Sequence, residues 1–222
     1  MPRISFAVFD LDGTLIDSRR DLADSANAML ATYGAPALAE ETVAAMVGCG
    51  AATLVARAVA ASNIVAPLDE ALQRFLSSYD QRLSRHTRPY DGIPRMLDDL
   101  SGTQTAMALL TNKPMAQSVR LLEIFGLAKY FRWIVGGDGP WPRKPSPDGM
   151  RHLMHQASAG PLETILVGDS AVDLITSRNA GVRICLARYG FGYADLPADD
   201  LRGDEALVDT PSEIAMVVHA SR

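Results

Sequence analysis

The chain has 222 residues, of which 48% are apolar and 21% are charged, with a formal net charge of −5. Its length fits one sizeable domain, or a core domain with a smaller insertion, and not two large independent domains. The acidic balance and the lack of a Lys/Arg-rich stripe exclude a nucleic-acid-binding protein. No stretch approaches the roughly 18 apolar residues of a membrane span, and no secretion signal begins the chain. We therefore expect a folded protein of the cytoplasm that does not associate with membranes.

Short apolar runs of strand length recur along the chain, with helix-length segments between most of them. Strands that alternate with helices predict a parallel sheet covered on both faces. We predict strands at residues 4–9, 105–110, 133–135, 164–167, 182–187 and 206–208, and helices at 114–125 and 147–156. The Gly- and Pro-rich residues 136–147 predict an exposed loop.

The alternation is interrupted between about residues 18 and 88, where helical patterns follow one another without a strand. The predicted helices span residues 18–32, 40–46, 51–61 and 67–84, and Ser18 is the expected N-cap of the first. We predict an α/β core domain, residues 1–17 and 89–222, with a Rossmann-like three-layer parallel sheet, and an inserted small helical cap domain, residues 18–88. Hinges are expected near residues 16–18 and 88–92.

Two acidic residues, Asp10 and Asp12, directly follow the first predicted strand. Alternation in an extended segment places both on one side, and ligands of open α/β sheets collect at the carboxyl ends of the strands. An Asp-x-Asp-Gly sequence is also compatible with an ordinary turn. Other strand ends decide between these interpretations.

Thr111 and Asn112 follow the second long strand and open a helix, a position that suits phosphate oxygens. Asp169 ends another strand, and Asp173 lies four residues later. Asp10, Asp12 and Asp169 are hard oxygen ligands of the kind that Mg²⁺ prefers, while Asp173 is interpreted either as a further ligand or as a residue that orients the others. Lys144, in the Gly- and Pro-rich loop, supplies a positive charge for this set.

These motifs together resemble the four motifs of the haloacid dehalogenase superfamily of phosphotransferases, in the right order and over essentially the whole chain. Within that superfamily the chain looks most like the phosphoglycolate phosphatase group with a helical cap. The residues that carry the resemblance are Asp10-Leu-Asp12-Gly13-Thr14, Leu110-Thr111-Asn112-Lys113, Lys144-Pro145, Gly168-Asp169-Ser170-Ala-Val-Asp173, and in the cap Met46-Val-Gly48-Cys49-Gly50.

The resemblance implies a phosphatase that uses Mg²⁺ and forms an aspartyl-phosphate intermediate. Asp10 would be the nucleophile and Asp12 the general acid and base. Asp10, Asp169 and the backbone carbonyl of Asp12 would hold the metal. Thr111, the Asn112 backbone and Lys144 would bind the phosphoryl group.

The cap is expected to select the substrate, since the core motifs contact only phosphate. Gly48, Cys49 and Gly50 form the predicted substrate-specificity loop, although they could merely connect two helices. Arg57 could bind a substrate carboxylate, but a solvated helix face is the preferred interpretation. Trp141, at the predicted rim of the site, could admit a larger substrate or simply form a surface contact.

The expected partner is a small phosphorylated metabolite, with 2-phosphoglycolate as the leading candidate, and the expected assembly is a monomer or a homodimer. A phosphatase acting on a sugar or amino-sugar phosphate or on pyrophosphate remains open, as does a sugar-phosphate mutase. The second aspartate of the first motif argues against a dehalogenase, and the absence of lysine from residues 18–88 argues against a phosphonatase. A non-catalytic binding protein is least favoured because the nucleophile, the acid/base and Lys144 are all present.

Overall fold

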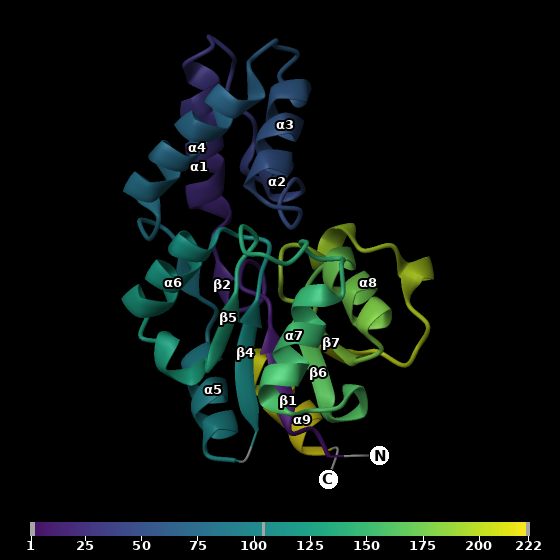
Figure 1. Cartoon of the computed structure of the whole chain (residues 1–222). Coiled ribbons are helices and arrows are strands. Elements are labelled where there is room, and N and C mark those ends of the chain that lie inside the picture. The colour runs from purple at the N-terminus through teal and green to yellow at the C-terminus, as the bar shows by residue number, and fades with distance from the viewer. Residues whose placement is uncertain (1–2, 104, 221–222) are drawn as a thin grey trace.

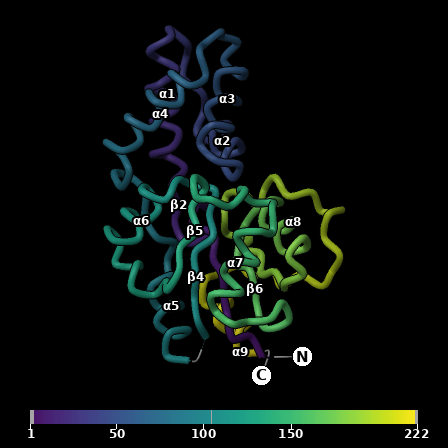
Figure 2. Tube along the Cα trace, viewed as in Figure 1, coloured from purple at the N-terminus to yellow at the C-terminus, as the bar shows by residue number. Residues whose placement is uncertain are grey.

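A computed structural model describes residues 3–103 and 105–220 as a parallel sheet with helices on both faces, with a group of four helices above one end of the sheet (Figure 1). The beginning of the first strand and the last helix lie at the opposite end of the molecule from the four-helix group (Figure 2). None of the helices in these ranges combines the length and the apolar character that a bilayer crossing requires.

The main sheet has six parallel strands in the order β5-β4-β1-β6-β7-β8. The first strand of the chain lies inside the sheet, where Phe9 pairs with Leu109 on one side and with Val167 on the other. Sequence-distant strand ends therefore meet at one edge. The strands are β1 (Phe6–Phe9), β4 (Ala106–Leu110), β5 (Trp133–Val135), β6 (Thr164–Gly168), β7 (Arg183–Ala187) and β8 (Ala206–Val208).

Alternate residues of each strand pack into two different apolar clusters. Ala7 and Phe9 belong to one cluster, and Phe6 and Val8 to the other, so β1 is fully buried on both faces. The first cluster lies under α5 (Ile93–Ser101), α6 (Met115–Ile124) and α9 (Pro211–Ala220); the second lies under α7 (Asp148–Ala157) and α8 (Ala171–Ala180). The core is a three-layer α/β/α fold, as the sequence predicts. Short 3₁₀ helices lie at Ala128–Tyr130, Pro161–Glu163, Tyr193–Asp195 and Ala198–Asp200.

The four helices between the first and second strands of the core form the inserted cap. They are α1 (Arg19–Ala31), α2 (Glu40–Ala44), α3 (Ala51–Ala61) and α4 (Leu68–Arg82). Each presents an apolar face at helical spacing: in α4, the buried residues are Ala71, Phe75 and Tyr79, four apart. The rings of Phe75 and Tyr79 stack with centroids 5.9 Å apart.

The chain enters and leaves the cap through one antiparallel ribbon formed by β2 (Ile16–Asp17) and β3 (Arg88–Pro89), in which Ile16 pairs with Pro89. Next to it, the buried carboxylate of Asp21 in α1 accepts hydrogen bonds from the backbone N–H groups of His86 (2.9 Å) and Thr87 (2.8 Å). Asp21 thus joins the first cap helix to the returning strand.

The six predicted strands and six predicted helices are present, with ends shifted by up to two residues. The two-residue strands β2 and β3 were not predicted, and no bounds were predicted for the helices α5, α8 and α9. The loop at residues 136–147 is exposed at residues 138–143 and at Pro145, but Gly136, Gly137 and Lys144 are buried. A Cβ at Gly137 would lie 2.1 Å from the Asn112 carbonyl oxygen, so this part of the loop packs directly on the end of β4.

Candidate active site

The predicted site residues converge at the carboxyl end of the parallel sheet, beneath the cap. Asp10 follows β1, Thr111 follows β4 and Asp169 follows β6, the three neighbouring strands of the sheet. Because parallel strands point the same way, residues separated by more than 100 positions in sequence become neighbours here.

Asp10 is the nearly buried carboxylate at the end of β1. Its backbone N–H continues the sheet by donating to the Val167 carbonyl (2.9 Å), which fixes its position. Its Oδ1 lies 2.9 Å from the Lys144 ammonium. Burial raises the pKa of Asp10 to about 6, against the opposing effect of Lys144, and the nearby Asp173 raises it further.

Lys144 is buried between two carboxylates, with its Nζ 2.9 Å from Asp10 and 2.6 Å from Asp173. Burial acts to lower the pKa of Lys144, but the two carboxylates raise it above its ordinary value, so the ammonium stays charged. Asn112 holds the Lys144 backbone from both sides: its Oδ1 accepts from Lys144 N (2.8 Å) and its Nδ2 donates to Lys144 O (2.9 Å). The loop that carries Lys144 is therefore fixed to the end of β4.

Asp169 lies at the end of β6, where Thr14 Oγ1 (3.3 Å) and Gly192 N–H (2.8 Å) donate to its two oxygens. Burial, followed by the charges of Asp173 and Asp10, raises the pKa of Asp169 well above its ordinary value. Asp173, in the first turn of α8, differs because both of its oxygens already have strong partners. Its Oδ1 accepts from Lys144 and its Oδ2 from the Ser170 hydroxyl (2.6 Å).

Asp10, Asp169 and Asp173 offer carboxylate oxygens within 4.8 Å of one another, all buried. Three buried carboxylates with one ammonium among them leave two negative charges, which a divalent cation would neutralise. The Gly13 backbone lies directly against Asp169: a Cβ at Gly13 would be 2.0 Å from Asp169 Oδ2, so a side chain there would displace this carboxylate. These residues fit Mg²⁺ by donor type and charge. The Asp12 side chain is not part of this cluster.

Asp12 instead points to the side of the site nearer the cap. The Lys113 ammonium lies 2.9 and 3.0 Å from its two oxygens, and the Ser18 hydroxyl donates to Oδ1 (2.6 Å). Ser18 stands at the N-cap position of α1, as predicted, but its side chain makes no capping hydrogen bond. The Ser18 hydroxyl donates to the Asp12 carboxylate, and its oxygen accepts no hydrogen bond from the first N–H groups of α1.

The predicted specificity loop of the cap does reach the core. Asn112 Nδ2 donates to the Gly48 carbonyl (2.8 Å), and a Cβ at Gly50 would lie 3.3 Å from both the Arg143 guanidinium and the Asn112 carbonyl. Gly50 has a φ of +90°, which favours glycine. Cys49 lies on the other side of the loop, with its Sγ 3.8 Å from an Arg57 nitrogen.

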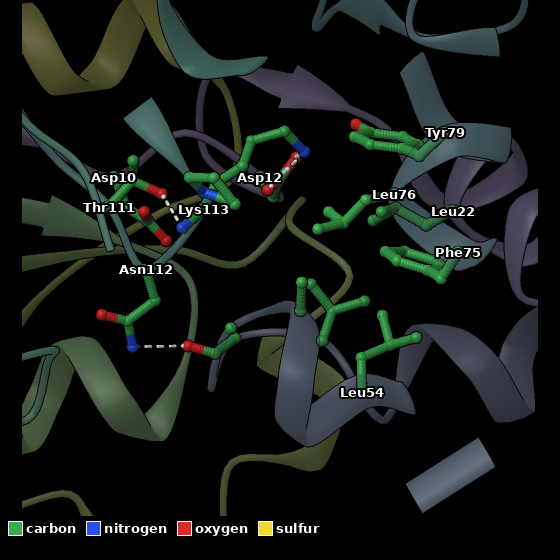
Figure 3. A pocket seen from close by; sticks show the side chains of 15 residues that line it. Asp10, Asp12, Leu22, Leu54, Phe75, Leu76, Tyr79, Thr111, Asn112 and Lys113 are labelled. Carbon is green, nitrogen blue, oxygen red and sulfur yellow. Dashed lines mark hydrogen bonds and ion pairs between the residues drawn. The ribbon is translucent and has the colours of Figure 1, made fainter. Parts of the chain in front are cut away.

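Two cavities meet at Asp10 and Asp12, under the cap. The first has an apolar wall formed by cap side chains (Figure 3) and is lined by Asp10, Asp12, Leu22, Val47, Gly48, Gly50, Ala51, Leu54, Phe75, Leu76, Tyr79, Thr111, Asn112, Lys113 and Pro114. The second contains Asp169, Ser170 and Arg57 together with the Cys49 side of the loop.

Three residues at this site were not singled out from the sequence: the Lys113 side chain, Ser18 as a partner of Asp12, and Tyr79. Lys113 follows the Thr111-Asn112 pair directly, which is the one signal that could have indicated it. Trp141 lines neither cavity and instead stacks on His152 of α7, with ring centroids 4.7 Å apart. It is therefore a surface contact on α7 and not the rim of these cavities.

Comparisons with known proteins agree with this geometry. The family model described as haloacid dehalogenase-like hydrolase matches residues 7–187. The plasmid phosphoglycolate phosphatase of Cupriavidus necator is 36% identical over 97% of this chain and 93% of its own length. The phosphoglycolate phosphatase of Chromobacterium violaceum is 40% identical over 88% of this chain and 89% of its own.

Among solved structures, that of a predicted phosphoglycolate phosphatase from Haemophilus somnus superimposes with a TM-score of 0.92 at 27% identity, covering 98% of this chain and 99% of the other. The fold, the strand-end residues and the extent of these matches agree with one another. This chain belongs to the haloacid dehalogenase-like hydrolases.

Proposed function

We propose that this protein is a Mg²⁺-dependent phosphatase that hydrolyses 2-phosphoglycolate through an aspartyl-phosphate on Asp10. One observation carries the chemistry: Asp10 and Asp12, two residues apart, lie in opposite environments. Asp10 faces Lys144 and the buried acidic cluster, while Asp12 faces Lys113 and the cap. The relatives named phosphoglycolate phosphatase support the choice of substrate.

In the first step, a carboxylate oxygen of Asp10 forms a bond to phosphorus as the bond between phosphorus and the ester oxygen breaks. Asp12, in its protonated form, gives its proton to the departing oxygen. In the second step, water attacks the phosphorus of the aspartyl-phosphate, Asp12 takes a proton from that water, and inorganic phosphate leaves with Asp10 regenerated. The Asp12 position, on the cap side of Asp10, suits both transfers.

Thr111, the Asn112 backbone and Lys144 are proposed to hold the phosphoryl oxygens, where charge spreads in the transition state. Mg²⁺, when bound, would reduce the repulsion between two anions that must approach each other. Asp10, Asp169 and the Asp12 backbone carbonyl are its proposed ligands. Asp173 is proposed to orient Lys144 and the acidic cluster, since its Oδ1 accepts from the Lys144 ammonium at 2.6 Å and its Oδ2 from the Ser170 hydroxyl, whereas both donors to Asp169 are uncharged.

We also propose that the cap extends over residues 18–88 and the core over residues 1–17 and 89–222, with hinges at residues 16–18 and 88–92. The ribbon of β2 and β3 supports these boundaries. Gly48, Cys49 and Gly50 are the proposed cap contacts with substrate. The proposed setting is the cytoplasm, as a monomer or a homodimer.

The test is phosphate release from 2-phosphoglycolate, sugar and amino-sugar phosphates, pyrophosphate and nucleotides, with Mg²⁺ and with the metal removed by a chelator. We expect 2-phosphoglycolate to lead by about tenfold or more in kcat/KM, equivalent to about 1.4 kcal/mol. A sugar phosphate in first place would overturn the substrate. A phosphorylated isomer formed without released phosphate would indicate a mutase.

A further inference from the structure

Lys113 occupies an unusual position between core and cap. It follows β4 in the core, is 6% exposed, and its ammonium lies both against Asp12 and 4.5 Å from the centre of the Tyr79 ring in the cap. Burial acts to lower the pKa of Lys113, but the Asp12 carboxylate raises it above its ordinary value, so the ammonium is charged. The reaction steps above give this charge no role.

Among the described residues that line the first cavity, Lys113 is the only cation. Lys144 is taken up by Asp10 and Asp173 and does not line this cavity. Arg57 lines the second cavity, where it donates to the Met46 carbonyl (3.2 Å). An anion placed against the apolar cap wall therefore has Lys113 as its counter-charge.

Several other polar donors near Lys113 are already used. Met115 N–H at the start of α6 donates to Asp138 (2.7 Å), Lys113 N–H donates to Thr111 Oγ1 (3.2 Å), and Pro114 has no N–H. The Asn112 amide is bonded to Gly48 and Lys144. Among these groups, the Lys113 ammonium is the one that can still donate, since it has three N–H donors.

Tyr79 provides a second, independent observation. Its hydroxyl is buried, and the one group that it interacts with is the Lys113 ammonium, itself a donor, so no acceptor is paired with it among the described residues. Figure 3 shows that end of the ring directed toward Lys113 and Asp12. A buried hydroxyl without a partner costs free energy unless a ligand supplies one. Burial raises the pKa of Tyr79 to about 12, so the group remains a donor.

We propose that Lys113 and Tyr79 together form the subsite for the carboxylate of the substrate. The proposal deepens the proposed function and rests on it. The ester oxygen must lie beside Asp12, which protonates it, and in 2-phosphoglycolate the carboxylate is one methylene away from that oxygen. An ammonium 2.9 Å from Asp12 is therefore within reach of this carboxylate, and its three N–H donors can serve the Asp12 side chain and the substrate carboxylate together.

Through this pair, a bound substrate would contact the core and the cap at the same time. Lys113 belongs to the core and Tyr79 to α4 of the cap. A substrate that carries a carboxylate would bridge the two, whereas a phosphate ester without one would leave the Tyr79 hydroxyl unpaired.

The test compares 2-phosphoglycolate with its neutral isostere 2-phosphoglycolamide in the full-length protein with Mg²⁺. The variants are Lys113→Met, Lys113→Arg and Tyr79→Phe, and Arg57→Met represents the competing cation. We expect Lys113→Met to lower kcat/KM for the carboxylate about 10- to 100-fold more than for the amide. Tyr79→Phe should also lower kcat/KM more for the carboxylate than for the amide, by about 3- to 10-fold. Lys113→Arg should retain part of the preference for the carboxylate that Lys113→Met loses. Arg57→Met should leave the ratio of the two kcat/KM values unchanged.

Binding supplies a readout that is independent of turnover. In the Asp10→Asn background, calorimetry should show that Lys113→Met raises the Kd of 2-phosphoglycolate by about 10-fold or more, while the Kd of inorganic phosphate changes by less than about 3-fold. Circular dichroism confirms that each variant is folded.

The outcomes separate the two proposals. If wild-type protein does not favour 2-phosphoglycolate in the substrate panel, the proposed function fails. If it does, but Lys113→Met and Tyr79→Phe reduce both substrates equally, Lys113 only positions Asp12 and the subsite is overturned. A loss of discrimination in Arg57→Met alone would also overturn it and assign the carboxylate to the second cavity.

Discussion

The core and the cap form opposite walls of one cavity and are built by different means. The core wall carries Asp10 and Asp12, and charged groups behind it hold one another in place. Lys144 lies between Asp10 and Asp173, and Asp169 accepts hydrogen bonds from Thr14 and Gly192. The cap wall is apolar, with Leu54, Phe75 and Leu76 among its residues. The contrast fits the proposed function, in which the core wall carries out the reaction and the cap wall, with Lys113 at the boundary, selects the substrate.

Rigid strands explain why the charges are on the core side. Asp10 is held by a sheet hydrogen bond, and its neighbours come from adjacent strand ends, so the site is ordered before substrate binds. The cap is joined to the core by one two-stranded ribbon and a few side-chain contacts. The cap side is therefore the one that can adjust.

The strongest test of the core wall is Asp10→Asn. We expect kcat to fall by about 1,000-fold or more, since the amide is a poor nucleophile and removes one charge from the metal cluster. Phosphate release under saturating Mg²⁺ measures it. Residual activity within about tenfold of wild type would place the nucleophile elsewhere.

Gly13→Ala should disturb the metal cluster without changing a charge. The new Cβ would lie 2.0 Å from Asp169 Oδ2 at a φ of +87°, so Asp169 must move. We expect Mg²⁺ affinity to fall about 10- to 100-fold, measured by the metal dependence of activity.

Gly48→Ala is the matched control for Gly13→Ala. Its φ is +105°, but nothing lies within 4 Å of the added Cβ. It should cost about 1 kcal/mol through backbone strain and leave Mg²⁺ affinity unchanged. Equal loss of affinity in both variants would show that strain, and not displacement of Asp169, is the cause.

Asp21→Asn tests whether a buried carboxylate of the cap has a structural role only. The amide would place an N–H₂ group or a weaker acceptor against the N–H groups of His86 and Thr87. We expect the free energy of unfolding to fall by about 1–3 kcal/mol, seen as a lower urea midpoint, with kcat unchanged because Asp21 lines neither cavity. An unchanged midpoint would contradict this role.

The smallest effect is expected at Glu205, which lies outside both walls. Burial opposes its charge, but N–H groups of Arg202 and Gly203 and the Arg178 guanidinium outweigh this effect and lower the pKa of Glu205 to about 2. Because the folded-state pKa is depressed, this carboxylate stabilises the fold above its ordinary pKa of 4.5, and the contribution is lost as pH falls toward 2. Glu205→Gln should lower Tm at pH 7, and the difference from wild type should shrink below pH 4.5. A difference that is constant with pH would show that charge is not involved.

The strand ends could be predicted from the sequence because each motif follows its own apolar run. Asp10, Thr111 and Asp169 therefore meet as expected, and Lys144, predicted from the loop after β5 as the cation of this set, lies with them. The order of the strands was not predicted, since it depends on packing between distant segments. The functions of Ser18 and Tyr79 depend on how the cap sits on the core, which local rules do not describe: the capping rule for Ser18 considers neighbours in the α1 backbone, whereas its partner Asp12 becomes close only in the folded chain.

The ribbon of β2 and β3 has a consequence for how this architecture can vary. Because Asp17 pairs with Arg88, the residues at which the chain leaves and re-enters the core are direct neighbours. The 70 or so residues between them form a module that can be replaced by an insertion of different size or shape while the sheet and its strand ends stay unchanged. New substrate ranges can therefore arise at this single point of the chain, with the hydrolytic machinery inherited intact.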